Sequence, residues 1–242
     1  MHPSDLQYFP VAWPVLLVLL VLFGAAVSVV IAGIVRFASA SMGIRAGTML
    51  TLLLLALLGS HTNIPIAYLP QRVVSGVTTI DFFGIPYVVP LVRRWPATVV
   101  AVNVGGCVIP TLLSLYLLVR NQLYGLSLVG VAIVTLVCHL LARPVPGLGI
   151  AEPVFIPPVI TAIVAVLLSR RYAAPLAYIS GSLGTLIGAD LLNLHRIQGL
   201  GAPVASIGGA GTFDGIFVTG LLAVVYAGVG VHLDAQQRVR GR

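Results

Sequence analysis

Two aspartates, Asp190 and Asp214, stand in the apolar C-terminal third of the chain. Asp190 lies in GTLIGADLLNL (184–194), at the end of one apolar run, and Asp214 lies in GGAGTFDGIFVTG (208–220), where the next begins. A charged side chain inside a membrane is costly, so such residues usually face the protein interior and carry function. These two carboxylates are therefore the first candidates for chemistry.

The two aspartates are expected to lie at the same depth. Consecutive membrane helices are antiparallel, so the end of one helix lies beside the start of the next. Gly188 and Gly211 stand close to the aspartates and would let the two helices approach each other. Two carboxylates in a low-dielectric site share one proton, so one acts as a base on water while the other donates to a substrate carbonyl oxygen.

A purely structural interpretation of the same residues stays open. Asp214 follows a glycine-rich stretch and could cap the last helix by accepting backbone N–H groups at its N-terminus. Asp190 could pair with Arg196 or His195 in the following loop.

Other polar residues are expected on the same side of the membrane, namely His61, Asn63, Asn103, His139 and Glu152. Interfacial histidines and helix-joining asparagines are common without function. Glu152, His139 and the two aspartates offer oxygen and imidazole ligands that could hold a metal. No HExxH motif indicates a zinc protease and no GxSG motif indicates a serine protease, so we predict neither a metal nor a cofactor.

The composition defines the elements that must position these residues. Of 242 residues, 59% are hydrophobic and 8% are charged, whereas soluble domains have about 25% charged residues. The chain is therefore predicted to be an all-α polytopic membrane protein, with residues 1–242 forming a single integral membrane domain. Seven transmembrane spans are expected, at residues 12–35, 47–60, 97–119, 126–142, 154–169, 173–194 and 213–232.

Some of these segments are expected to depart from a regular helix. Two spans are short and several contain Gly or Pro, as in NVGGCVIP (103–110), which favours broken or re-entrant segments. The stretch VTTIDFFGIPYVVP (77–90) predicts a small hairpin over the membrane surface. Cys107 and Cys138 lack CxxC spacing, so buried thiols are expected.

The arginines predict the orientation. The net charge of +7 rests on thirteen arginines, eight expected on the C-terminal side of the membrane and five on the opposite side. Positively charged loops tend to stay in the cytoplasm, which predicts a cytoplasmic C-terminus and an external N-terminus. The C-terminal side has short connections and the opposite side has long ones. Loop arginines of this kind do not indicate a nucleic-acid partner.

The stretch GTFDGIFVTG resembles the motif of the GxGD intramembrane aspartyl proteases, which include presenilin, signal peptide peptidase and the prepilin peptidases. The resemblance implies that Asp214 is the motif aspartate, with Gly211 at the first motif position and Asp190 as its partner. Phe213 takes the place of the second glycine.

A broader resemblance covers the chain through ARPVPGLGIAEP, GTLIGADLLNL and SIGGAGTFDGIFVTG. Together these stretches resemble a prokaryotic membrane-protein family described only as a domain of unknown function. This resemblance implies a fold and residence in a bacterial or archaeal inner membrane, but the family has no assigned activity that could supply a mechanism.

Three functional hypotheses follow. The first is an intramembrane aspartyl protease, or a degenerate relative, that uses Asp190 and Asp214 on a transmembrane-helix substrate. The second is a proton- or ion-coupled transporter of small solutes that uses the same carboxylates. The third is a non-catalytic assembly or lipid-binding factor. In each case membrane lipids are the expected surroundings.

Overall fold

The computed structural model describes residues 13–70, 72–82, 85–95, 97–145, 149–153, 155–197, 203–209, 216 and 219–229, and the side chains of 72–95 lie outside the description. Gly211, Phe213 and Asp214 also lie outside the described residues.

Helices dominate the described chain and confirm the predicted polytopic class. Four helical stretches are long and apolar enough to cross a membrane, namely Trp13–Met42, Val104–Asn121, Tyr124–Leu141 and Ala173–Ile197. Three shorter apolar helices, Ala46–Gly59, Ile156–Leu168 and Thr219–Val229, complete the set found in the described residues. Each of the seven falls on one predicted span.

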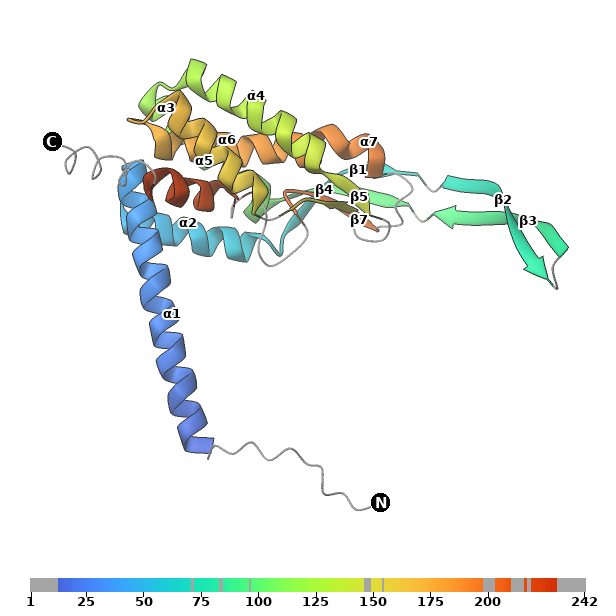
Figure 1. The fold of residues 1–242 in the computed structure, drawn as a ribbon, viewed down its shortest axis with the longest axis horizontal. Helices are drawn as coiled ribbons and strands as arrows, with labels where there is room; N and C mark the ends of the chain where they lie inside the picture. The colour runs from blue at the N-terminus through green and yellow to red at the C-terminus, as the bar shows by residue number, and fades with distance from the viewer. Residues whose placement is uncertain are drawn as a thin grey trace.

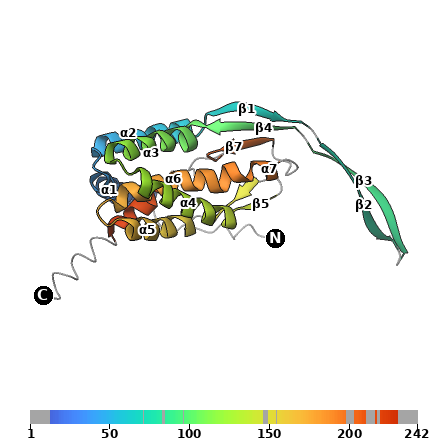
Figure 2. The ribbon, with the colours of Figure 1, turned by 90° about the horizontal axis from the view of Figure 1, so that it is seen from above.

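The helices are labelled in chain order. They are α1 (Trp13–Met42), α2 (Ala46–Gly59), α3 (Ile109–Asn121), α4 (Tyr124–Leu141), α5 (Ile156–Leu168) and α6 (Ala173–Thr185). Figure 1 shows α2 to α6 side by side in a bundle, whereas most of α1 projects away from it. Figure 2 shows α2 and α3 on one side of α6, with α4 and α5 on the other.

The third predicted span begins differently from expectation. Residues 98–103, expected to be helical, form strand β4 (Thr98–Asn103), followed by a π-helix, η1 (Val104–Val108), and then α3. The strand sequence TVVAVN is rich in β-branched residues and its burial alternates over the first three positions, both of which favour a strand. The break predicted at NVGGCVIP is thereby confirmed.

The strands gather at one end of the bundle. β1 (Asn63–Leu69), β4 and β7 (Val204–Ile207) form a three-stranded sheet in that order, with β1 antiparallel and β7 parallel to β4. Two short strands, β5 (Arg143–Val145) and β6 (Gly149–Ala151), pair beside α4 and α5. The long connections thus all lie at this sheet end, and the short ones at the opposite end (Figure 1).

The predicted hairpin is confirmed and is longer than expected. β2 (Arg72–Phe82) pairs with β3 (Ile85–Trp95) in an antiparallel register that runs from Arg72 opposite Trp95 to Phe82 opposite Ile85. Both views show the hairpin extending away from the helices (Figures 1 and 2).

Helix α6 is the centre of the core. Ten consecutive residues from Ala173 to Ser182 are buried, and Tyr178, Leu176 and Ile179 are fully buried. Small residues allow this burial, because a Cβ added at Gly184 would lie 2.6 Å from the Cβ of Val134 on α4. The chain at the end of α6 is therefore pressed against α4.

Candidate functional site

The helix that begins as α6 changes its winding before it ends. It continues as a π-helix, η2 (Leu186–Asp190), a 3-10 turn, η3 (Leu191–Asn193), and a last short turn, α7 (Leu194–Ile197). Asp190 stands at the junction of the π and 3-10 segments. Such π-bulges occur frequently at functional sites, since they interrupt the regular hydrogen bonding of the helix.

Gly188 fixes where this irregular segment meets α4. A Cβ added to Gly188 would collide with the Thr135 carbonyl oxygen and would lie 2.9 Å from the Cβ of Cys138. A side chain at this position would therefore push the segment that carries Asp190 away from α4.

Gly188→Ala is accordingly expected to lower the free energy of unfolding by about 1 to 3 kcal/mol, the usual cost of overpacking. Gly33→Ala is the matched control, because a Cβ at Gly33 in α1 meets nothing within 4 Å. Thermal unfolding in detergent measures both, and equal midpoints for the two variants would contradict the tight contact.

One Asp190 oxygen has a defined partner across the site. Its Oδ2 accepts a hydrogen bond of 2.7 Å from the backbone N–H of Gly208, just after β7. Gly208 has a φ of +94°, and a Cβ there would lie 2.6 Å from the backbone nitrogen of Cys107 in η1. Only glycine accepts this backbone with so close a neighbour. Gly208 therefore lies between Asp190 and the first π-helix.

Asn193 is a site residue that the sequence interpretation missed. It is fully buried, and its Nδ2 donates to the carbonyl oxygens of Gly188 and Ala189, at 2.9 Å each. The same nitrogen lies 3.3 Å from Nδ1 of His139, at the end of α4. The Asn193 amide therefore binds two carbonyl groups of the π-helix η2 and links this irregular segment to α4. The available signal was a single amide in the apolar run that follows Asp190.

Glu152 supplies a second carboxylate to this region. It lies between β6 and α5, where its Oε1 is buried without a conventional hydrogen-bond partner in the described chain. Burial raises the pKa of Glu152 from its ordinary value of 4.5 to about 7; the neighbouring Cys138 thiol lowers it, and the negative charge of Asp190 raises it. The Cys138 sulfur also lies 3.5 Å from Oγ1 of Thr185. We call Asp190, Glu152, Cys138, His139 and Asn193 the carboxylate cluster.

The raised pKa of Glu152 makes the stability of the protein pH-dependent. The folded state holds this proton more tightly than the unfolded state, so stability falls as pH rises from about 4.5 to about 7. Between pH 5 and pH 8 the loss is expected to be about 2 kcal/mol.

Glu152→Gln should remove the contribution of Glu152, so the midpoint should fall less between pH 5 and pH 8 than in the parent and be higher than the parent's at pH 8. Thermal unfolding of the parent and the variant at both pH values in one detergent measures the effect. A variant with the same pH dependence as the parent would show that another group is responsible.

A second group of polar side chains lies at the base of the sheet. Asn103 is fully buried; its Nδ2 donates to the carbonyl of Ser60 at 2.7 Å and to Oδ1 of Asn63 at 3.1 Å. Its Oδ1 accepts a hydrogen bond from the N–H of Gly106, so the Asn103 side chain caps the start of η1. The hydroxyl of Ser206 on β7 lies 2.6 Å from Oδ1 of Asn63. These bonds tie η1 to all three strands of the sheet.

The structure thus separates the predicted site residues into groups. Asp190, His139 and Glu152 belong to the carboxylate cluster, and Gly188 packs beneath it. Asn63 and Asn103 hold the sheet together. Asn63 also binds Ser206, which precedes Gly208 by two residues. His61 is exposed in the turn after α2 and contributes to neither group. In the described part of the chain, no three His, Cys, Asp or Glu side chains gather in a way that could hold a metal ion.

Comparison with known proteins gives one match. Residues 57–226 match the model of the family described as "Protein of unknown function (DUF1614)". The chain belongs to this DUF1614 family. No curated protein and no solved structure matches the chain.

The DUF1614 match includes every residue of the carboxylate cluster. It begins inside α2, ends inside the last described helix and also includes both predicted aspartates, whereas α1 precedes it. The predicted membership of an uncharacterised membrane-protein family is therefore confirmed.

In this DUF1614 protein, the described residues on both sides of Asp214 are anchored to the α6 segment. Before it, Gly208 donates to Asp190. After it, Ile216 is buried in the same apolar cluster as Leu186, at the start of η2. Further along, a Cβ added to Gly181 of α6 would lie 3.3 Å from the Cα of Gly220. Residues before and after position 214 therefore pack against the helix that carries Asp190.

Proposed function

We propose that this DUF1614 protein is an intramembrane aspartyl peptidase in which Asp190 and Asp214 form the catalytic pair. The observation that carries the proposal is the hydrogen bond from the Gly208 N–H to the Asp190 carboxylate. Asp214 follows Gly208 by only six residues, so the chain leading to it starts at the Asp190 side chain.

The packing of the residues after position 214 against the α6 segment supports this pairing. Ile216, two residues after Asp214, shares a cluster with Leu186, four residues before Asp190. Asp214 is proposed to join Asp190 in the site from this neighbouring segment.

The chemistry assigns a role to each carboxylate. Asp190, which accepts a backbone N–H, is the ionised base, because such a bond stabilises a charged acceptor. It takes a proton from water as the water oxygen attacks the peptide carbonyl carbon, and protonated Asp214 gives its proton to the carbonyl oxygen. In the second step Asp190 gives its proton to the amide nitrogen, Asp214 takes one from a diol hydroxyl, and the C–N bond breaks.

A cleavage assay tests the proposal directly. The purified full chain is reconstituted in vesicles with single-span peptides, and new termini are identified by mass spectrometry. A hydroxyethylene peptide isostere, which mimics the tetrahedral intermediate, should inhibit at concentrations at least about a hundredfold below substrate. Absence of cleavage across a library of transmembrane peptides would overturn the proposal.

Proton-coupled transport is a second candidate, and Glu152 favours it. Glu152 places a third carboxylate near Asp190, and Asp190 lies in a membrane helix interrupted by π and 3-10 turns. Transporters use carboxylates near such helix breaks to bind protons or ions. A pH gradient across vesicles that contain the protein should then drive solute uptake, and Glu152→Gln should abolish the coupling. Uptake without any proteolysis would favour transport over the peptidase.

We also infer the orientation. Arg45 and Arg120 are at the end of the bundle with short connections, where most arginines are predicted. The positive-inside tendency supports placing this end, with the C-terminus, in the cytoplasm of a prokaryotic cell. Protease protection of tags at the two termini tests the assignment, and a C-terminal tag cleaved from outside intact cells would reverse it.

A further inference from the structure

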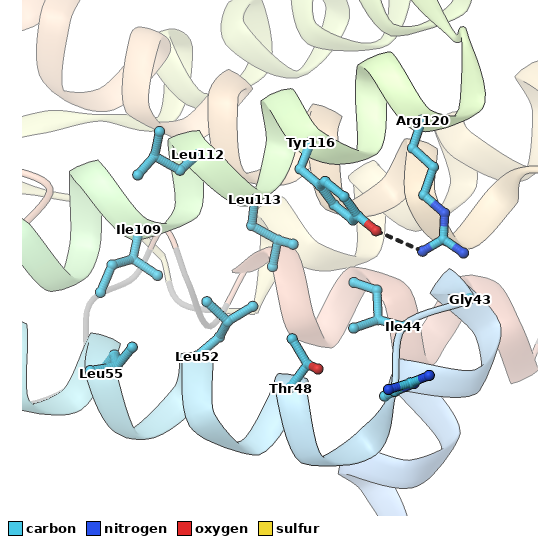
Figure 3. A pocket seen from close by; sticks show the side chains of 11 residues that line it. Gly43, Ile44, Thr48, Leu52, Leu55, Ile109, Leu112, Leu113, Tyr116 and Arg120 are labelled. Carbon is cyan, nitrogen blue, oxygen red and sulfur yellow. Dashed lines mark hydrogen bonds between the residues drawn. The ribbon is translucent and has the colours of Figure 1, made fainter.

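A groove far from the carboxylate cluster runs between α2 and α3. It begins at the turn joining α1 to α2, has a volume of about 770 Å³ and lies within the usual range of ligand sites, about 300 to 1,000 Å³. Its walls are mainly aliphatic, with Leu52 and Leu55 facing Leu113 and Ile109 (Figure 3).

The charges of the groove lie at one end. Arg45 stands at the start of α2, and Arg120 stands near the end of α3, so both mark the end with short connections. The Arg120 guanidinium donates to the Tyr116 hydroxyl at 3.0 Å and lies 5.7 Å from the centre of that ring. Figure 3 shows this pair above the α1–α2 turn. Among the described residues, no acidic side chain lines the groove.

We propose that this groove binds an anionic phospholipid, with its phosphate between Arg45 and Arg120 and one acyl chain along the aliphatic walls. Guanidinium groups suit phosphate because their donors match its oxygens. The walls are open to the surroundings, since Leu55 and Leu112 are exposed side chains on membrane helices. A lipid in the adjoining leaflet can therefore enter from the side. This site does not depend on the proposed peptidase activity.

The side of the membrane agrees with this ligand. The two arginines lie at the end that the arginine distribution places in the cytoplasm, and anionic lipids give the cytoplasmic leaflet its negative surface potential. The complementary charge favours an acidic headgroup over a zwitterionic one.

Native mass spectrometry of the full chain in neutral detergent tests the proposal. Phosphatidylglycerol should bind at least about tenfold more tightly than phosphatidylcholine of the same chains, because charged hydrogen bonds are stronger. Arg45→Gln with Arg120→Gln should remove that preference, whereas Arg36→Gln, an exposed arginine on α1 outside the groove lining, should retain it. Equal binding of the two lipids by the parent overturns the proposal, whether or not the variants fold.

A second variant tests the acyl part of the site. Leu52→Trp should fill the groove and weaken phosphatidylglycerol binding at least about tenfold, since the displaced chain loses its apolar contacts. Inorganic phosphate alone should neither bind tightly nor compete at equal concentration. Competition by phosphate, or unchanged lipid binding in Leu52→Trp, would show that only the headgroup end is used and would contradict the phospholipid site.

Discussion

Asp214→Asn is expected to abolish peptide cleavage, with a loss of about a hundredfold to ten-thousandfold. This is the usual contribution of a positioned acid or base. An amide at position 214 has no proton to donate to the substrate oxygen, and Asp190→Asn removes the base that takes the proton from water. Because the two act as a unit, the double variant should be no slower than either single variant. Initial cleavage rates in vesicles measure all three.

Asp81→Asn is the matched control for these variants. Asp81 lies on β2, in the hairpin that extends away from the bundle, so its change should leave cleavage at the parental rate (Figure 1). Cleavage retained by Asp214→Asn would exclude the aspartate pair and leave any hydrolysis to another mechanism.

Gly208→Ala is expected to lower the free energy of unfolding by about 3 kcal/mol or more. One part is the cost of a side chain at a φ of +94°, about 1 to 3 kcal/mol. The other is the overpacking of a Cβ placed 2.6 Å from the backbone nitrogen of Cys107, about 1 to 3 kcal/mol. Relief of either strain moves Gly208 and breaks its hydrogen bond with Asp190. Thermal unfolding in detergent measures the loss, and activity should fall with it.

Gly125→Ala provides the comparison, because a Cβ there meets nothing within 4 Å and the residue lies in the first turn of α4. Alanine favours a helix over glycine by about 0.5 to 1 kcal/mol, so this variant should be as stable as the parent or slightly more stable. A Gly208→Ala protein as stable as Gly125→Ala would show that the loop has room to move away from η1.

The apolar runs were sufficient to predict the helices. Each run is bounded by polar or Pro-rich residues, so the seven spans and the contrast between short and long connections follow from composition alone. Asp190 was also identifiable, since an acidic residue in such a run is conspicuous. Local sequence therefore predicts the bundle and one member of the site.

The three-stranded sheet and the π-turn at η2 were not predictable in the same way. β7 pairs with β4 in parallel, Val99 opposite Val204, and no local pattern indicates a partner so distant along the chain. The π-turn at η2 depends on Asn193, which donates to carbonyls made available only after the helix widens. Glu152 reaches Cys138 from a loop, where hydrophobic periodicity carries no signal.

The parallel pairing of β4 with β7 also sets an order of events during synthesis. β4 emerges from the ribosome well before β7, so Asp190 lacks its Gly208 partner until β7 and the residue after it have been made. A growing chain can insert α1 to α6 while its site is still incomplete. The site is therefore completed only after β7 has been made, which would keep the proposed peptidase inactive while the earlier helices insert.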